Sequence, residues 1–199
     1  MLTKDELLLP LSRLRTHEVV VTCMSATRPW GRLSSHDLDF ASADSAMGHT
    51  ADLALGIALA QPSRKVICLN GDGSMLMTLG TLATVVGSGA TNLILFVLEN
   101  GTYEITGNQA IPGAGLVDFA GFARAAGFTR VYSFRRAEDY EAALPGILTG
   151  EGPVFVGVEM EAGGEGPISR SDREEARYLK TSLAEWSREF RRAITHRGG

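Results

Sequence analysis

A short apolar segment, residues 66–69, leads directly into Asn70-Gly71-Asp72-Gly73-Ser74. The segment is rich in β-branched residues, which is typical of a buried strand. Residues 75–86 follow the glycine turn and are long enough for a helix, and residues 93–98 form a second apolar strand segment before Asn100-Gly101. This part of the chain is therefore predicted to be a βαβ unit with a polar turn after each strand.

Asp72 and Asn100 are predicted to lie side by side. In a right-handed βαβ unit the carboxyl ends of the two parallel strands are neighbours, and open α/β sheets bind their ligands at this edge. A carboxylate and a carboxamide oxygen beside a glycine turn suit magnesium that is held jointly with a phosphate group. The spacing thus predicts a magnesium–phosphate site.

Strand-like and helix-like segments alternate along the rest of the chain. This alternation predicts an α/β fold, a doubly wound and mostly parallel sheet with helices on both faces. Residues 25–44 lack a clear period and contain Pro29, so we expect a long loop there. The other expected strands are 18–24, 129–134 and 154–160, and the other expected helices are 4–14, 48–60, 116–126 and 137–148.

The carboxyl-terminal part changes composition. We expect one domain over residues 1–161, a glycine-rich linker over 162–170 and a charged helical tail over 171–199. Ser171 and Glu174 have the spacing of a capping box at the start of that helix. Its apolar stripe favours two interpretations equally, packing on its own domain or binding a partner.

Composition excludes several classes of function. A chain of 199 residues with 44% apolar and 21% charged residues fits one globular domain. The formal net charge of −4 gives no indication of a nucleic-acid or membrane surface. Residues 1–6 are polar and acidic, unlike a signal peptide, so a cytoplasmic location is expected. Cys23 and Cys68 lie in apolar segments and are expected to be reduced, buried thiols.

The motif Gly71-Asp72-Gly73-Ser74, with Asn100 28 positions after Asp72, resembles the thiamine-diphosphate motif of the decarboxylase superfamily. The resemblance is to the diphosphate-binding (PP) domain and extends over roughly residues 18–160. It implies that Asp72 and Asn100 ligate Mg²⁺ through side-chain oxygens and Thr102 through its carbonyl. It also implies that the diphosphate is bound at the turn, by residues Gly71, Gly73, Ser74, Asn100 and, through a backbone donor, Ile105.

A second part of the resemblance lies upstream, at Ser45-Ala46-Met47-Gly48. In this family a large apolar residue wedges between the two cofactor rings and forces a bent shape, and Met47 matches it. The Ser45 carbonyl and the Met47 amide would hold the pyrimidine edge. Alone, Met47 would be read as a core methionine. His49, beside the wedge, is a catalytic candidate whose alternative is a helix-start contact.

Within the superfamily, residues 48–60 and 100–109 are most similar to sulfopyruvate decarboxylase β chains and to the matching half of phosphonopyruvate decarboxylase. That resemblance implies a 2-oxoacid substrate carrying a sulfonate or phosphonate, for which Arg28, Arg32 and His36 are candidate cationic contacts. It also implies that a catalytic glutamate comes from a pyrimidine-binding (PYR) domain on a separate α chain. Paired domains suggest an α2β2 or larger assembly.

Two alternatives stay open beside the decarboxylase. Thr106 stands about where simple decarboxylases carry an acidic residue, so a carboligase or acyloin synthase subunit is the first alternative. A cofactor-binding regulatory subunit without turnover of its own is the second. A dinucleotide-binding protein is disfavoured, because the first strand is not followed by Gly-x-Gly-x-x-Gly.

Overall fold

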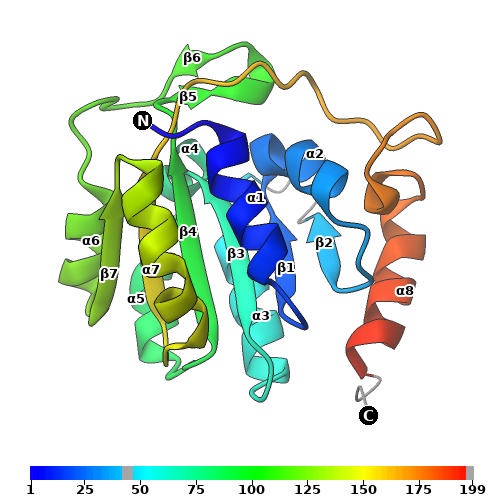
Figure 1. Ribbon diagram of the computed structural model, residues 1–199, viewed down its shortest axis with the longest axis horizontal. Helices are drawn as coiled ribbons and strands as arrows, with labels where there is room; N and C mark the ends of the chain where they lie inside the picture. The colour runs from blue at the N-terminus through cyan, green and yellow to red at the C-terminus, as the bar shows by residue number, and fades with distance from the viewer. Residues whose placement is uncertain (42–46, 196–199) are drawn as a thin grey trace.

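A computed structural model describes residues 1–41 and 47–195 and contains a six-stranded sheet in which all neighbouring strands run parallel (Figure 1). The strand order is β2-β1-β3-β4-β8-β7. The predicted α/β fold is confirmed. The bounds are β1 Val19–Thr22, β2 Asp39–Ala41, β3 Val66–Gly71, β4 Leu93–Glu99, β7 Arg130–Phe134 and β8 Val154–Glu159, with a separate antiparallel pair, β5 Thr102–Tyr103 and β6 Gln109–Ala110.

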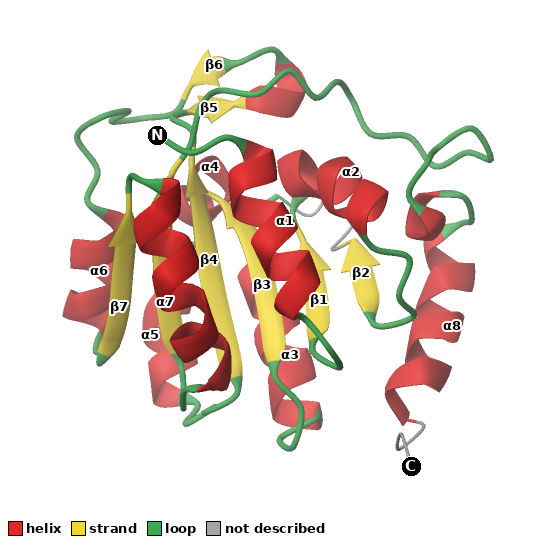
Figure 2. Ribbon diagram, in the orientation of Figure 1, coloured by secondary structure: helices red, strands yellow, loops and turns green. Residues whose placement is uncertain are grey.

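Helices cover both faces of the sheet (Figure 2). The face nearer the viewer carries α1 Lys4–Leu14, α2 Met24–Leu33 and α7 Ala137–Thr149; the far face carries α3 Thr50–Ala60, α5 Thr81–Gly87 and α6 Phe119–Ala126. Because both faces are covered, the central strands are almost continuously apolar and buried, as the all-buried segment 93–98 of β4 shows. Among the described residues, no helix is both long enough and apolar enough to cross a membrane.

The loop predicted over residues 25–44 was wrong. Most of this segment forms α2 and β2, although α2 contains Pro29. Proline removes one helical hydrogen bond, but α2 buries Trp30 completely and packs against α1. Burial of this large side chain outweighs the local penalty, and Pro10 and Pro145 are likewise inside helices α1 and α7.

The helix predicted over residues 75–86 is two helices, α4 Asp72–Met77 and α5, separated at Thr78-Leu79-Gly80. The Thr78 hydroxyl donates to the carbonyl of Gly48, outside the helix. The helix predicted to start at Leu116 begins at Phe119, because Asp118 caps it by accepting the Gly121 N–H at 2.7 Å.

The charged tail forms a short 3₁₀ turn, Arg177–Leu179, and the helix α8, Leu183–Thr195. The capping box predicted at Ser171 and Glu174 was wrong. The helix starts further along the chain, where Ser182 and Glu185 exchange side-chain and backbone hydrogen bonds of 3.0 and 3.3 Å.

Helix α8 packs beside β2, at the edge of the sheet (Figure 1). The Trp186 indole N–H donates to the Asp39 carbonyl at 2.9 Å, and the Phe190 ring lies 4.9 Å from the Phe40 ring between centroids. Of the two interpretations of the apolar stripe, these contacts support packing on its own domain. Both cysteines are free and buried, as expected, and burial raises the pKa of the Cys68 thiol.

Candidate functional site

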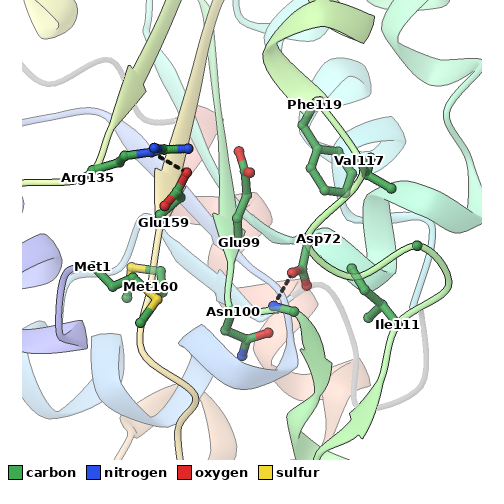
Figure 3. A pocket seen from close by; sticks show the side chains of 13 residues that line it. Met1, Asp72, Glu99, Asn100, Ile111, Val117, Phe119, Arg135, Glu159 and Met160 are labelled. Carbon is green, nitrogen blue, oxygen red and sulfur yellow. Dashed lines mark hydrogen bonds and ion pairs between the residues drawn. The ribbon is translucent and has the colours of Figure 1, made fainter.

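The predicted site lies at the carboxyl edge of β3 and β4, where Gly71 is paired with Leu98 (Figure 3). Asp72 follows β3 directly and is 2% exposed. Its Oδ2 accepts the Gly101 N–H at 2.6 Å, and its Oδ1 accepts the Gly73 N–H at 2.7 Å. The turn after β4 is therefore hydrogen-bonded to the carboxylate that follows β3. The prediction that the two turns lie side by side is confirmed.

Burial raises the pKa of Asp72, and the hydrogen bonds from Gly101 and Gly73 oppose that rise. The neighbouring Glu99 is half-buried, and its burial, followed by the charge of Asp72, raises its pKa to about 7. Both groups would be stabilised in their ionised form by a cation. Figure 3 shows the Glu99 carboxylate directed away from Asn100 and toward the Arg135–Glu159 ion pair, into a cavity of about 350 Å³.

The Asn100 carboxamide is held by two contacts. Its Oδ1 accepts the Thr102 N–H at 3.0 Å, and its Nδ2 donates to Glu104 Oε2 at 3.1 Å. The two contacts specify the same orientation of the amide, with the oxygen on the side of the turn and the nitrogen toward Glu104. An amide oxygen has two lone pairs, so Oδ1 keeps one for a ligand.

One narrow cleft, with about 30 Å³ of free space, brings nearly all predicted residues together. It continues into a wider groove of about 740 Å³ that is bounded by residues 164–168. Sequence reasoning missed Met24 and Cys23 as walls of the cleft, whereas Tyr103 and Glu104, expected to line or cover the site because they follow the metal loop, do line it. The predicted residues that line the cleft are Met47, Gly71, Asp72, Gly73, Ser74, Asn100, Thr102 and Ile105; Ser45 lies outside the described residues.

Glycine is required at position 73 because the Tyr103 side chain comes very close to the backbone there. A Cβ atom at this position would lie 2.5 Å from Cε1 of the Tyr103 ring and 3.1 Å from Cγ2 of Ile111. The Tyr103 ring therefore packs directly on the backbone of the Gly-Asp-Gly turn. Only glycine lets the turn after β3 and the loop after β4 close on each other here.

The turn that carries Met47 is tied to the same element. The Gly48 N–H donates to Ser74 Oγ at 3.0 Å, and the Gly48 carbonyl accepts from Thr78. Gly48 has φ of +90°, a conformation that glycine adopts without strain. Ser74, predicted to bind diphosphate, thus also positions Met47, and its own hydroxyl proton stays available to donate. Thr78 was missed because nothing local in the sequence indicates this long-range contact.

Residues 23–158 match the family described as thiamine pyrophosphate enzyme, C-terminal TPP binding domain. The chain belongs to this family. The matched segment includes every cleft residue named above and begins at Cys23, on the cleft wall.

The named relatives of this TPP-binding domain include decarboxylases of two kinds. Phosphonopyruvate decarboxylase of Streptomyces viridochromogenes is 34% identical over 91% of this chain and 43% of its own length. Sulfopyruvate decarboxylase subunit beta of Methanothermobacter thermautotrophicus is 37% identical over 67% of this chain and 70% of its own length. The chain therefore spans less than half of the phosphonopyruvate decarboxylases but most of the β subunit.

A solved structure shares the fold of this TPP-binding domain. The thiamine diphosphate-dependent 4-hydroxybenzoylformate decarboxylase of Rhodococcus jostii RHA1 superimposes with a TM-score of 0.68 at 22% identity, over 82% of this chain and 33% of that one.

The donor set of the TPP-binding domain fits a metal shared with a diphosphate. Within residues 1–41 and 47–195, no group of three or more His, Cys, Asp or Glu side chains is arranged to hold a metal. At the end of the two strands the cleft instead offers the Asp72 carboxylate and the Asn100 amide oxygen, since both oxygens of Glu104 are engaged by other donors, and this leaves coordination positions for phosphate oxygens. The buried Asp72 carboxylate is hydrogen-bonded by backbone N–H groups, so a divalent cation would supply the compensating charge.

His49 precedes α3 and does not line the cleft. Its side chain is 67% exposed, and its Nδ1 lies 2.9 Å from Asp52 Oδ2. Asp52 in turn accepts from Thr81. A catalytic role for His49 stays a prediction, and the contacts seen in the structure are those of its alternative, a helix-start residue.

The three candidate cations of segment 25–44 have protein partners. Arg28 forms a two-pronged ion pair with Glu174 at 2.6 and 2.9 Å and also donates to the carbonyls of Gly166 and Pro167. Arg32 pairs with Glu165 at 2.7 Å. His36 precedes β2 and thus lies at the amino edge of the sheet, opposite the cleft.

Residues 163–168, which we call the strap, run over the carboxyl edge of the sheet toward α8 (Figure 1). Arg28 and Arg32 of α2 fasten the strap from one side, and the Asn108 side chain donates to the Gly163 carbonyl at 3.0 Å from the other. The arginines that were candidates for binding substrate therefore fix one wall of the groove.

Replacing Arg28 by methionine is expected to lower the free energy of unfolding at pH 7 by about 2 kcal/mol, because a charge-assisted hydrogen-bonded pair is lost. Arg28 holds the pKa of Glu174 below its usual 4.5. The part of the stabilisation that comes from the ion pair is therefore complete above pH 4.5 and disappears as the pH falls through the lowered pKa of the folded state, whereas the hydrogen bonds to the Gly166 and Pro167 carbonyls remain. Urea unfolding between pH 7 and pH 3 measures this difference.

The matched control for this pair is Arg135→Met. Arg135 pairs with Glu159 at 2.6 Å, but its side chain is 77% exposed, so its loss should cost less than about 0.5 kcal/mol. Equal losses in the two variants, or a loss in Arg28→Met that is as large at pH 3 as at pH 7, would contradict this interpretation.

Proposed function

We propose that this chain is the PP-domain β subunit of a two-chain, thiamine diphosphate- and Mg²⁺-dependent decarboxylase. Its substrate would be a 2-oxoacid of the sulfopyruvate or phosphonopyruvate type. The observation that carries the proposal is the cleft itself, in which Asp72, Asn100 and Thr102 converge with Met47. The names of the relatives support the reaction class, and the coverage of a β subunit supports the two-chain arrangement.

In this proposal Asp72 and Asn100 bind Mg²⁺ through side-chain oxygens and Thr102 binds it through its carbonyl. Gly73, Ser74 and Ile105 donate to the diphosphate, and Gly71 allows the turn to approach it closely. Met47, which lines the cleft, supports the bend of the cofactor. The adjacent Gly48 is hydrogen-bonded to Ser74 and Thr78. When bound, the cofactor supplies an electron sink for the carbon that loses carbon dioxide.

A partner chain would complete the reactive end. The carboxylates that line the narrow cleft are Asp72 and Glu104, and each already accepts hydrogen bonds from this chain. A glutamate directed at the pyrimidine ring is therefore proposed to come from the PYR domain of an α chain, in an α2β2 or larger assembly. Such an arrangement would place the groove at the interface between the two chains.

The test is an activity titration. The purified chain is assayed for release of carbon dioxide from sulfopyruvate, phosphonopyruvate and pyruvate, with Mg²⁺ and thiamine diphosphate, alone and with a PYR-domain chain that co-purifies with it or is encoded by a neighbouring gene. We expect no turnover alone and a rise that saturates at a 1:1 ratio of chains. Full activity of the chain alone would refute the two-chain proposal, and a sub-stoichiometric requirement would favour a regulatory subunit.

The carboligase alternative has one observation in its favour. Thr106, at the position where an acidic group would act in proton transfer, is exposed and donates to Gln109 Oε1 at 2.8 Å. Repeating the assay with an acceptor aldehyde separates the two reactions, because a carboligase yields an acyloin in place of a free aldehyde.

A further inference from the structure

Glu104 is a buried carboxylate beside the metal loop, and its side chain is 1% exposed. Its Oε1 accepts from Lys4 Nζ at 2.5 Å and from the Glu165 N–H at 2.9 Å. Its Oε2 accepts from Asn100 Nδ2 at 3.1 Å. Three segments that are far apart in sequence therefore meet on one side chain that none of the proposed roles uses.

Both carboxylate oxygens of Glu104 are engaged by donors, and Lys4 compensates the charge. A buried ion without full partners is costly, so the three donors explain how Glu104 is accommodated. With both oxygens held in place, Glu104 can orient the Asn100 side chain that donates to it. Glu104 is the acceptor that draws the Asn100 nitrogen away from Asp72. The amide oxygen of Asn100 is consequently left on the side where it also accepts the Thr102 N–H.

We propose that Glu104 is a positioning residue that fixes the Asn100 carboxamide with its oxygen toward the metal. The proposal rests on the proposed function, because it takes Asn100 as a metal ligand. Without a carboxylate at position 104 the two ends of the amide would be nearly equivalent sterically, and rotation by half a turn would present an N–H₂ donor to the cation. Groups that orient metal ligands typically matter 10–100-fold in metal affinity.

The substitution Glu104→Gln tests this specifically. The oxygen of the introduced glutamine can still accept from Lys4 and Glu165, so its nitrogen would face Asn100 Nδ2, donor against donor. Asn100 is expected to turn its oxygen toward that nitrogen and away from the metal. Titration of the full chain with Mn²⁺ and thiamine diphosphate, followed by electron paramagnetic resonance, should then show binding weakened by roughly 30-fold.

The double variant Asn100→Asp with Glu104→Gln should restore binding. The introduced glutamine would donate through its amide nitrogen to one oxygen of the introduced aspartate and leave the other oxygen for the metal, so the hydrogen bond returns with its partners exchanged. The double variant is expected to bind Mn²⁺ at least about tenfold more tightly than E104Q and more tightly than N100D, in which two carboxylates face each other. A residue that only stabilises the fold would show no such recovery.

Two further variants distinguish failure of the metal site from failure of the proposed role of Glu104. Glu141→Gln makes the same substitution at an exposed carboxylate of α7, so it should bind Mn²⁺ like the wild type. Asp72→Ala should abolish binding. Undiminished binding in Asp72→Ala, or none in the wild type, would overturn the metal site and with it both proposals. Loss in Asp72→Ala with wild-type affinity in E104Q, or no recovery in the double variant, would overturn the role of Glu104 alone.

Discussion

Replacing Asp72 by alanine is expected to abolish Mg²⁺-dependent binding of thiamine diphosphate by the full chain. The substitution removes a charged ligand and leaves the Gly101 and Gly73 N–H groups without their acceptor. Loss of a group that merely orients a ligand costs 10–100-fold in metal affinity, so loss of the ligand should exceed about 100-fold. Isothermal titration calorimetry with Mg²⁺ held constant measures the change.

The fold should survive this substitution. Burial raises the pKa of Asp72, which means that its ionised form is disfavoured in the folded chain without a cation. Its removal relieves that cost but leaves two N–H groups without an acceptor, so the free energy of unfolding of the metal-free chain is expected to fall by about 1–3 kcal/mol. Glu151→Ala, an exposed carboxylate before the amino end of β8, is the matched control and should bind normally. Unchanged affinity in Asp72→Ala would remove the basis of the proposed function.

Replacing Trp186 by alanine is expected to lower the free energy of unfolding by about 4 kcal/mol. The indole is 1% exposed, lies 6.2 Å from the Tyr178 ring between centroids, and donates to the Asp39 carbonyl. Its removal leaves a cavity and an acceptor without its donor. Urea unfolding followed by circular dichroism measures the loss.

Two variants serve as controls for Trp186. Trp186→Phe keeps most of the ring but loses the hydrogen bond, so it should cost about 1–2 kcal/mol. Phe122→Ala removes an aromatic side chain that is 45% exposed and should cost less than about 1 kcal/mol. Unchanged stability in Trp186→Ala would indicate that α8 does not depend on the sheet edge and would revive the alternative that it binds a partner.

Local sequence patterns predicted the sheet and the position of the cleft. Residues 66–69 and 93–98 are continuous apolar segments followed by glycine turns, and this pattern depends only on neighbouring residues. Right-handed connection of parallel strands then brings Asp72 and Asn100 to one edge. The roles of the cofactor-binding residues came from the family resemblance and stay predictions until the variants are measured.

What local patterns could not predict depends on contacts between distant segments. Residues 25–33 are helical because α2 buries Trp30 and packs against α1, and α1 lies outside any sequence window around Pro29. Glu174 has capping-box spacing to Ser171 but pairs with Arg28, 146 positions away. No local pattern predicted the contacts of Glu104, because its partners Lys4 and Glu165 lie 100 positions before it and 61 positions after it.

The position of β8 has a consequence for synthesis on the ribosome. Among the described strands β8 comes last, yet it lies between β4 and β7, and residues just beyond it pair with Leu2. Until β8 has left the exit tunnel, β7 has no neighbour in the sheet and Glu104 lacks its contact with the strap. The loop after β4 therefore reaches its final contacts only after β8 and the strap have emerged, and until then the unpaired edge of β7 stays exposed to aggregation.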